Sequence, residues 1–212
     1  MTDQPRFVVL GTGGDFTTQV LNSLLEQNVQ PLAYIQWSES NQAQAYSAFG
    51  IPVEVKKAPD TLSDLLARHR VEFFFKSADL SLQLHALDPE FLLVACWPEL
   101  IEPNALQQAS NAALNLHPSL LPKYRGIDPI GEQLKQAENR FGVSLHLLSN
   151  EYDCGDIVAQ SEVFPKNKTS RKEIESACAK KGAELFIEAL QRYDKPGWTQ
   201  RSQDDCQVHF VK

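Results

Sequence analysis

The first half of the chain alternates short, strongly apolar runs with amphipathic stretches. Residues 7–10, 71–75 and 91–96 form such apolar runs, which are typical of parallel strands covered on both faces. Residues 16–27 instead have helical spacing, with Val20, Leu21, Leu24 and Leu25 on one side. Because strands that alternate with helices are joined by right-handed crossovers, this pattern predicts an α/β fold. We expect a doubly wound, mostly parallel sheet of Rossmann-like type.

The same criteria place the remaining elements and make the C-terminal part mixed. Strands are expected at residues 31–36, 53–55, 113–116, 142–148 and 157–163. Helices are expected at residues 41–49, 61–69, 130–138 and 170–193, the last opened by a capping box of Ser170 and Glu173. We therefore expect one catalytic domain over residues 1–193 and a polar C-terminal tail over residues 194–212.

Composition and charge exclude several classes of protein. The net charge is −7 and no long Lys/Arg cluster occurs, so nucleic-acid binding is not favoured. No apolar stretch reaches the roughly 18 residues of a membrane span, and the polar start does not resemble a signal peptide. The four cysteines are widely spaced, which favours neither a zinc site nor a disulfide framework. We expect a cytoplasmic protein that needs no metal, and a homodimer is one arrangement open to it.

A glycine-rich turn, Gly11-Thr12-Gly13-Gly14, follows the first strand. It is not a dinucleotide-binding fingerprint, because residue 16 is Phe16, and no Gly-Lys-Ser/Thr follows that would make it a P-loop. Asp15 also places a negative charge where a phosphate would lie. Two interpretations stay open: a tight strand-to-helix turn, or a turn in which Gly11, Thr12 and Gly13 contact an acceptor substrate.

Two polar stretches follow predicted strands. Asn115 and His117 end a strand and, being two residues apart, point the same way into the edge where α/β sheets bind ligands. Asp153 lies in the turn between two later strands. Taken singly, such a histidine is more often structural, and an aspartate near a glycine is more often part of a solvated turn.

Together these stretches resemble the 10-formyltetrahydrofolate-dependent formyltransferases. That family carries Asn-x-His, then Ser-Leu-Leu-Pro, then a basic or aromatic pair with Gly, and later an Asp-x-Gly turn. The corresponding stretches here are Asn115-Leu116-His117, Ser119-Leu120-Leu121-Pro122, Tyr124-Arg125-Gly126 and Asp153-Cys154-Gly155. The resemblance spans residues 7–164 and implies transfer of a formyl group to an amine, with no metal.

The resemblance also implies roles for individual residues. Asn115 and His117 would donate hydrogen bonds to the oxyanion formed during transfer, while Asp153 would hold His117 as imidazolium and handle the amine's proton. Folate would lie beside residues 95–101 and 150–153, which line the pterin pocket in the family. We therefore expect 10-formyltetrahydrofolate to be bound by Trp97, Pro98, Leu100, Ile101, Asn150 and Tyr152, and the acceptor by Gly11, Thr12, Gly13, Arg125 and Gly126.

Three acceptors are familiar in this family: glycinamide ribonucleotide, methionyl-tRNA and nucleotide-linked amino sugars. The purine enzyme normally has Ser-Asn where this chain has Gly14-Asp15. The tRNA enzyme has a basic insertion after the second strand and an appended domain, whereas residues 37–42 here are Trp-Ser-Glu-Ser-Asn-Gln and the sequence ends at Lys212. We therefore expect a small amine such as an amino sugar, with glycinamide ribonucleotide as the alternative and tRNA last.

Two other classes of function stay open. One is a hydrolase that releases formate from the same folate, and the other is a folate-binding protein without turnover. The presence of Asn115, His117 and Asp153 argues against the second, because a pure binding protein does not need all three.

Overall fold

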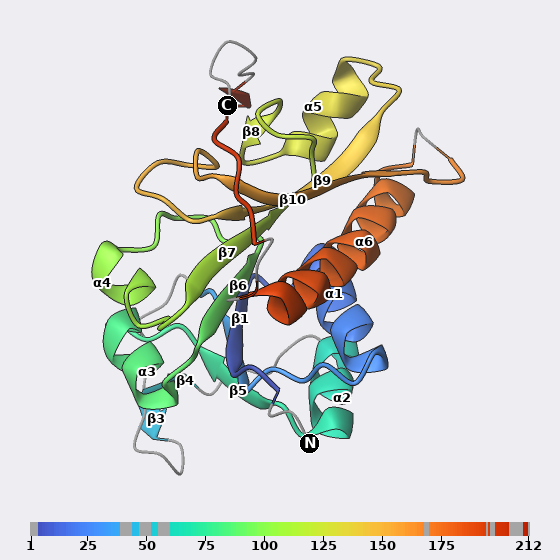
Figure 1. Ribbon diagram of the computed structural model, residues 1–212. Helices are drawn as coiled ribbons and strands as arrows, with labels where there is room; N and C mark the ends of the chain where they lie inside the picture. Colours follow the sequence, from blue (N-terminus) through green and yellow to red (C-terminus); the bar gives the residue numbers. More distant parts are fainter. Residues whose placement is uncertain are drawn as a thin grey trace.

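The computed structural model describes residues 4–38, 44–46, 52–54, 60–167, 170–193, 195, 198–203 and 210–211 (Figure 1). Its centre is a seven-stranded sheet with the strand order β10-β9-β7-β6-β1-β2-β5. The strands are β1 (Phe7–Gly11), β2 (Ala33–Gln36), β5 (Glu72–Phe75), β6 (Phe91–Ala95), β7 (Ala112–His117), β9 (Phe141–Leu147) and β10 (Ile157–Val163). The first five run parallel to one another, whereas β9 pairs antiparallel with both β7 and β10. The predicted α/β fold, mostly parallel with a mixed C-terminal part, is confirmed.

Helices cover both faces of this sheet (Figure 1). On one face lie α1 (Asp15–Glu26), α2 (Asp60–His69) and α6 (Arg171–Arg192), and on the other lie α3 (Leu80–Leu87) and α4 (Pro103–Leu106). Strand β1 shows why both faces are apolar: Phe7 and Val9 join the core under α1 and α6, whereas Val8 and Leu10 join the core under α3 and α4. This alternation is the two-residue period of a strand buried on both sides.

Two pairs of short strands and one short helix complete the described elements. Strands β3 (Gln44–Tyr46) and β4 (Pro52–Glu54) pair antiparallel with each other, and β8 (Arg125–Gly126) pairs parallel with β11 (Phe210–Val211). Helix α5 (Pro129–Lys135) follows β8 closely. No helix among the described residues combines the length and apolarity needed to cross a bilayer.

The predicted helix at residues 41–49 is wrong where the structure describes that segment, because residues 44–46 form strand β3. The alanines there suit a helix, yet pairing with β4 decides the conformation, since strand preference depends on cross-strand partners. Residues 41–43 and 47–50 lie outside the described part. Helices α3 and α4 were not predicted, although Asp79 caps α3 by accepting from Leu82 N at 2.9 Å and Pro103 opens α4.

The strand order fixes where a ligand can bind. Strands β2 and β5 lie on one side of β1, whereas β6 and β7, which come later in the sequence, lie on the other side. The strand order therefore reverses at β1. Parallel sheets bind ligands in the crevice at such a reversal, beyond the carboxyl ends of the strands. Here that crevice adjoins Gly11, Ala95 and His117, the last residues of β1, β6 and β7.

Phe186 of α6 provides a test of how much this helix stabilises the sheet. Its side chain is fully buried, and its ring packs edge-on against Phe7 with 5.1 Å between centroids. Phe186→Ala should lower the free energy of unfolding by about 3–5 kcal/mol, from lost burial and the remaining cavity. Urea unfolding would measure the loss. The control Leu82→Ala, at a side chain 60% exposed, should change it by less than about 0.5 kcal/mol; equal effects of the two would contradict this packing.

Candidate active site

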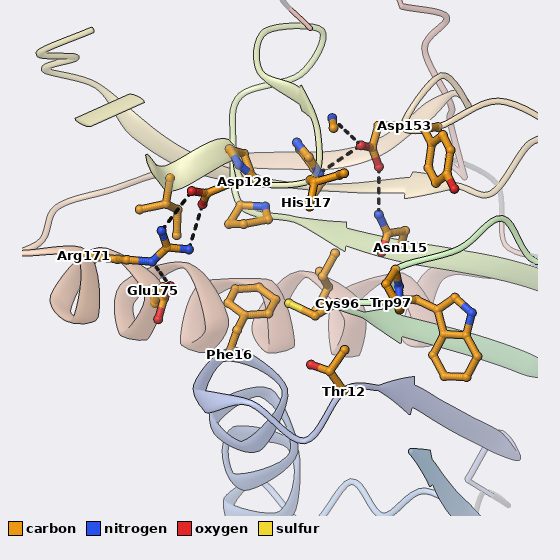
Figure 2. Close-up of a pocket in the computed structure, with 18 residues that line it drawn as sticks. Thr12, Phe16, Cys96, Trp97, Asn115, His117, Asp128, Asp153, Arg171 and Glu175 are labelled. Atoms are coloured by element: carbon orange, nitrogen blue, oxygen red, sulfur yellow. Dashed lines mark hydrogen bonds and ion pairs between the residues drawn. The ribbon is translucent and has the colours of Figure 1, made fainter. Parts of the chain in front are cut away.

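Asn115 and His117 meet Asp153 at the carboxyl end of β7 (Figure 2). Asn115 Nδ2 donates to Asp153 Oδ1 at 3.2 Å, and His117 Nδ1 lies 3.5 Å from Asp153 Oδ2. Asn115 and His117 share one face of β7, while Asp153 comes from the turn between β9 and β10. The three side chains therefore converge as the sequence predicted, although their catalytic role stays a prediction.

His117 has a defined hydrogen position. Its Nε2 lies 2.7 Å from the carbonyl oxygen of Tyr124, which can only accept, so Nε2 carries hydrogen. Nδ1 then faces Asp153. Burial lowers the pKa of His117, and the negative charge of Asp153 opposes that shift without overcoming it. This direction of shift favours a neutral ring in the substrate-free site, with Nδ1 able to accept a proton. That Asp153 holds His117 as imidazolium stays a prediction.

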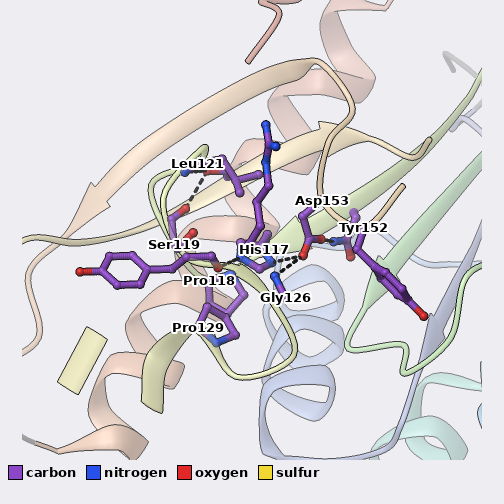
Figure 3. A network of polar contacts seen from close by, with 12 residues as sticks. His117, Pro118, Ser119, Leu121, Gly126, Pro129, Tyr152 and Asp153 are labelled. Atoms are coloured by element: carbon purple, nitrogen blue, oxygen red, sulfur yellow. Dashed lines mark hydrogen bonds and ion pairs between the residues drawn. The ribbon is translucent and has the colours of Figure 1, made fainter. Parts of the chain in front are cut away.

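Asp153 is held as a carboxylate. Its Oδ2 accepts from the backbone N–H of Gly126 at 2.9 Å, as Figure 3 shows, and its own backbone is left-handed at φ 54°. Burial acts to raise the pKa of Asp153, but His117, His146 and the Gly126 N–H outweigh it and hold that pKa well below its usual range. Gly126 thus supports the site through its backbone, at φ 114°.

His146 is a fourth polar residue of this group that the sequence analysis missed. It lies on β9 directly opposite Asn115, is 1% exposed, and bonds through Nδ1 to the carbonyl of Leu147 at 2.8 Å. Its Nε2 consequently accepts from Asn115 Nδ2 at 3.0 Å and lies 3.5 Å from Asp153 Oδ1. Both amide hydrogens of Asn115 are therefore engaged. Asn115, His117, His146 and Asp153 are called the polar cluster below.

The polar cluster borders a cavity of about 260 Å³, the main cavity, at the crevice between β1, β6 and β7. Eight of the predicted binding or catalytic residues line its wall: Thr12, Trp97, Pro98, Asn115, His117, Gly126, Tyr152 and Asp153. Most of the lining is apolar, and Arg171 closes the end opposite Trp97 together with Asp128 and Glu175 (Figure 2). A shaped apolar cavity with a few convergent polar groups is typical of a small-molecule site.

A smaller neighbouring cavity of about 40 Å³ extends the site beyond Trp97. It brings in Leu100 and Ile101, and it shares Asn115, Tyr152 and Asp153 with the main cavity. Trp97 Nε1 is buried without a hydrogen-bond partner, and Tyr152 remains 49% exposed. An unpaired indole N–H and apolar walls fit a flat, polar-edged ring such as a pterin.

Four predicted binding residues do not line either cavity: Gly11, Gly13, Asn150 and Arg125. A side chain at Gly11 would come within 2.7 Å of the Ala95 carbonyl oxygen, and Gly13 has φ 78°, so both glycines satisfy the turn itself. Arg125 is 2% exposed and donates to Gln203. Within the glycine-rich turn of residues 11–14, Thr12 is the predicted binding residue that lines the main cavity.

The described residues contain no group of three His, Cys, Asp or Glu side chains that could hold a metal ion. The absence of a metal requirement stays a prediction.

Comparison with known proteins places the chain in a family. A model of the formyl transferase family matches residues 5–190. The methionyl-tRNA formyltransferase of Protochlamydia amoebophila is 28% identical over 196 residues, which are 92% of this chain and 60% of that protein. The enzyme of the same name from Thermotoga neapolitana is 26% identical over 210 residues, 97% of this chain and 64% of that protein. The chain thus spans less than two thirds of both relatives.

Solved structures show the same fold. Glycinamide ribonucleotide transformylase 1 from Symbiobacterium toebii has a TM-score of 0.69 at 18% identity, with 96% of each chain covered. A 4-N formyltransferase from Francisella tularensis has a TM-score of 0.63 at 17% identity, covering 98% of this chain and 76% of that one. With a family model over most of its length and this fold, the chain belongs to the formyl transferase family, as the Asn115-x-His117 and Asp153 motifs indicated.

Proposed function

We propose that this protein transfers a formyl group from 10-formyltetrahydrofolate to a small primary amine, such as a nucleotide-linked amino sugar. The observation that carries the proposal is the convergence of Asn115, His117 and Asp153 beside a cavity with an apolar, aromatic end at Trp97. The folate supplies an activated formyl carbon when bound, and Trp97, Leu100, Ile101 and Tyr152 would hold its ring.

The hydrogen positions suggest how the polar cluster handles the proton. As the amine attacks, it must lose a proton, and the bare Nδ1 of His117 is a stronger base than the Asp153 carboxylate, whose pKa is held low. The imidazolium that forms is stabilised by Asp153 at 3.5 Å. It then lies ready to return the proton to the departing nitrogen.

Asn115 is placed to stabilise the formyl oxygen as that oxygen gains negative charge. Its two amide hydrogens bond to His146 and Asp153 before substrate arrives, so one must turn toward the oxygen during the reaction. A hydrogen bond made only at that stage lowers the barrier instead of merely binding substrate.

The other end of the main cavity supports an amine acceptor. Arg171 is held by Asp128 through two bonds of 2.8 and 3.1 Å and by Glu175 at 2.7 Å. Arg171 is the one Lys or Arg among the described residues lining the cavity, against three carboxylates: Asp128, Asp153 and Glu175. This excess of negative charge favours a protonated amine or hydroxyl groups and disfavours a phosphate at this position.

Methionyl-tRNA is a second candidate acceptor, because the relatives at 26–28% identity are methionyl-tRNA formyltransferases. Phe16, Ile127 and Ile130 at the cavity wall could accept a methionine side chain. Glycinamide ribonucleotide is the third, since solved enzymes acting on it share the fold.

One experiment separates these acceptors. The protein is incubated with 10-formyltetrahydrofolate in four separate reactions, which contain a nucleotide-linked amino sugar, methionyl-tRNA, glycinamide ribonucleotide or buffer alone. Mass spectrometry then measures the masses of the products. We expect the amino sugar to gain one formyl group fastest. Fastest gain on methionyl-tRNA or on glycinamide ribonucleotide would replace the proposed acceptor. Formate release at the same rate without any amine would replace transfer by hydrolysis.

A further inference from the structure

A segment far from the sequence motifs reaches the turn that carries Asp153. Residues 198–203 lie along β10, where Arg201 and Ile157 exchange two backbone hydrogen bonds of 2.8 and 2.9 Å. This anchor directs the side chain of Gln203 into the turn between β9 and β10. There Gln203 Nε2 donates to the carbonyl oxygens of Asp153 at 2.8 Å and Gly155 at 2.7 Å.

The other end of the same carboxamide holds the loop that follows β7. Gln203 Oε1 accepts from Arg125 Nε at 3.0 Å and from a terminal nitrogen of Arg125 at 2.8 Å. Arg125 precedes Gly126, whose N–H binds the Asp153 carboxylate at 2.9 Å (Figure 3). Gln203 therefore holds Asp153 in two ways. It binds the backbone of the Asp153 turn directly, and through Arg125 it holds the loop whose Gly126 N–H binds the Asp153 side chain.

The turn needs such support. Asp153 has φ 54°, a left-handed conformation that costs free energy in a residue with a side chain. The turn is also tight, because a Cβ placed on Gly155 would come within 1.8 Å of the Leu147 carbonyl oxygen. A catalytic carboxylate that moves by about 1 Å can lose roughly 10²-fold in rate, so its backbone must be fixed.

We propose that Gln203 is a positioning residue that holds Asp153 against His117 by hydrogen-bonding the Asp153 turn to Arg125. This inference rests on the proposed catalytic role of Asp153. It assigns to residues 198–203, which the sequence analysis placed in a polar tail, a direct part in the geometry of the site. Arg125, expected to bind the acceptor, serves in this arrangement as the anchor of Gln203.

Two substitutions and one control test the proposal. Gln203→Met keeps the length of the side chain and removes its donors and acceptor. Gln203→Glu keeps acceptors for Arg125 but cannot donate to the carbonyls of Asp153 and Gly155. The control is Ser202→Ala, at an exposed neighbouring residue. Circular dichroism first confirms that each variant is folded.

The first measurement needs no substrate. The chain has five histidines, so the His117 imidazole can be followed by NMR during a pH titration and assigned with a His117→Gln variant. The Asp153 carboxylate raises the pKa of His117 against the effect of burial. In Gln203→Met the carboxylate should drift away, and the pKa of His117 should fall further. An unchanged His117 titration in the folded variant would overturn the proposal.

The second measurement is kinetic, with 10-formyltetrahydrofolate and the amine that reacts fastest in the panel above. Both Gln203 variants should lose about 10- to 100-fold in kcat with little change in the folate KM. A side chain that only fills space would leave kcat of Gln203→Met at the wild-type value, which would also overturn the proposal. If Asp153→Asn itself keeps wild-type kcat, the proposed catalytic role of Asp153 fails instead, whatever the Gln203 variants do.

Discussion

Asp153→Asn is expected to keep folate affinity and to lower kcat by about 10²- to 10⁴-fold, the usual range for losing a group that assists proton transfer. Asparagine preserves the shape of the side chain and can still accept from the Gly126 N–H, which donates to Asp153 Oδ2 at 2.9 Å. It removes the negative charge that lies 3.5 Å from His117. The imidazolium formed during transfer would then lack its counter-charge in a buried site, where that loss is costly.

Asp156→Asn is the matched control, because it makes the same chemical change in the same turn without touching either cavity. Its kcat should stay near that of the wild type. Steady-state kinetics give kcat, and equilibrium titration with folate gives affinity. Wild-type kcat in Asp153→Asn would remove the catalytic assignment. Lost folate affinity at unchanged kcat would instead make Asp153 a binding residue.

Much of the fold follows from local sequence patterns. Apolar strands such as β1 and β6 and the capped helix α6 have strong periodic patterns, so they are predicted to within a few residues. Helix α3 shows the limit, because its eight residues are mostly apolar and resemble a buried strand as much as a helix. Strand β3 shows another, since its pairing with β4 depends on contacts that local propensity does not contain.

The site is predictable where its residues lie in motifs and unpredictable where tertiary contacts supply them. Asn115 and His117 follow from their two-residue spacing at a strand end. His146 belongs to the site only because the antiparallel register of β7 and β9 places it opposite Asn115. Gln203 lies 50 residues after Asp153 in the sequence and reaches it because Arg201 forms a strand-like bridge with Ile157. The sequence around Gln203 is merely polar. Neither register nor bridge is visible in composition or periodicity.

His117→Gln is expected to reduce kcat by about 10²- to 10⁴-fold while leaving the fold stable. The amide nitrogen of glutamine can take the place of Nε2, which bonds to the Tyr124 carbonyl at 2.7 Å. The loop after β7 should therefore stay anchored. The amide cannot accept a proton at the position of Nδ1, so the amine would lose its base.

His117→Asn makes the complementary change, because its shorter amide lies near the position of Nδ1 and cannot reach Tyr124. It should lower both kcat and the thermal midpoint, whereas His117→Gln should lower kcat alone.

In the wild type, kcat should fall at acid pH as His117 becomes protonated, at a pH below the usual histidine range because burial lowers the pKa of His117. That acid limb should vanish in His117→Gln. Kinetics between pH 4 and 8, about the span over which histidine and carboxyl groups titrate, would show it. A His117→Gln enzyme with wild-type kcat would mean that His117 only anchors the loop, and the proton would then have to pass through Asp153.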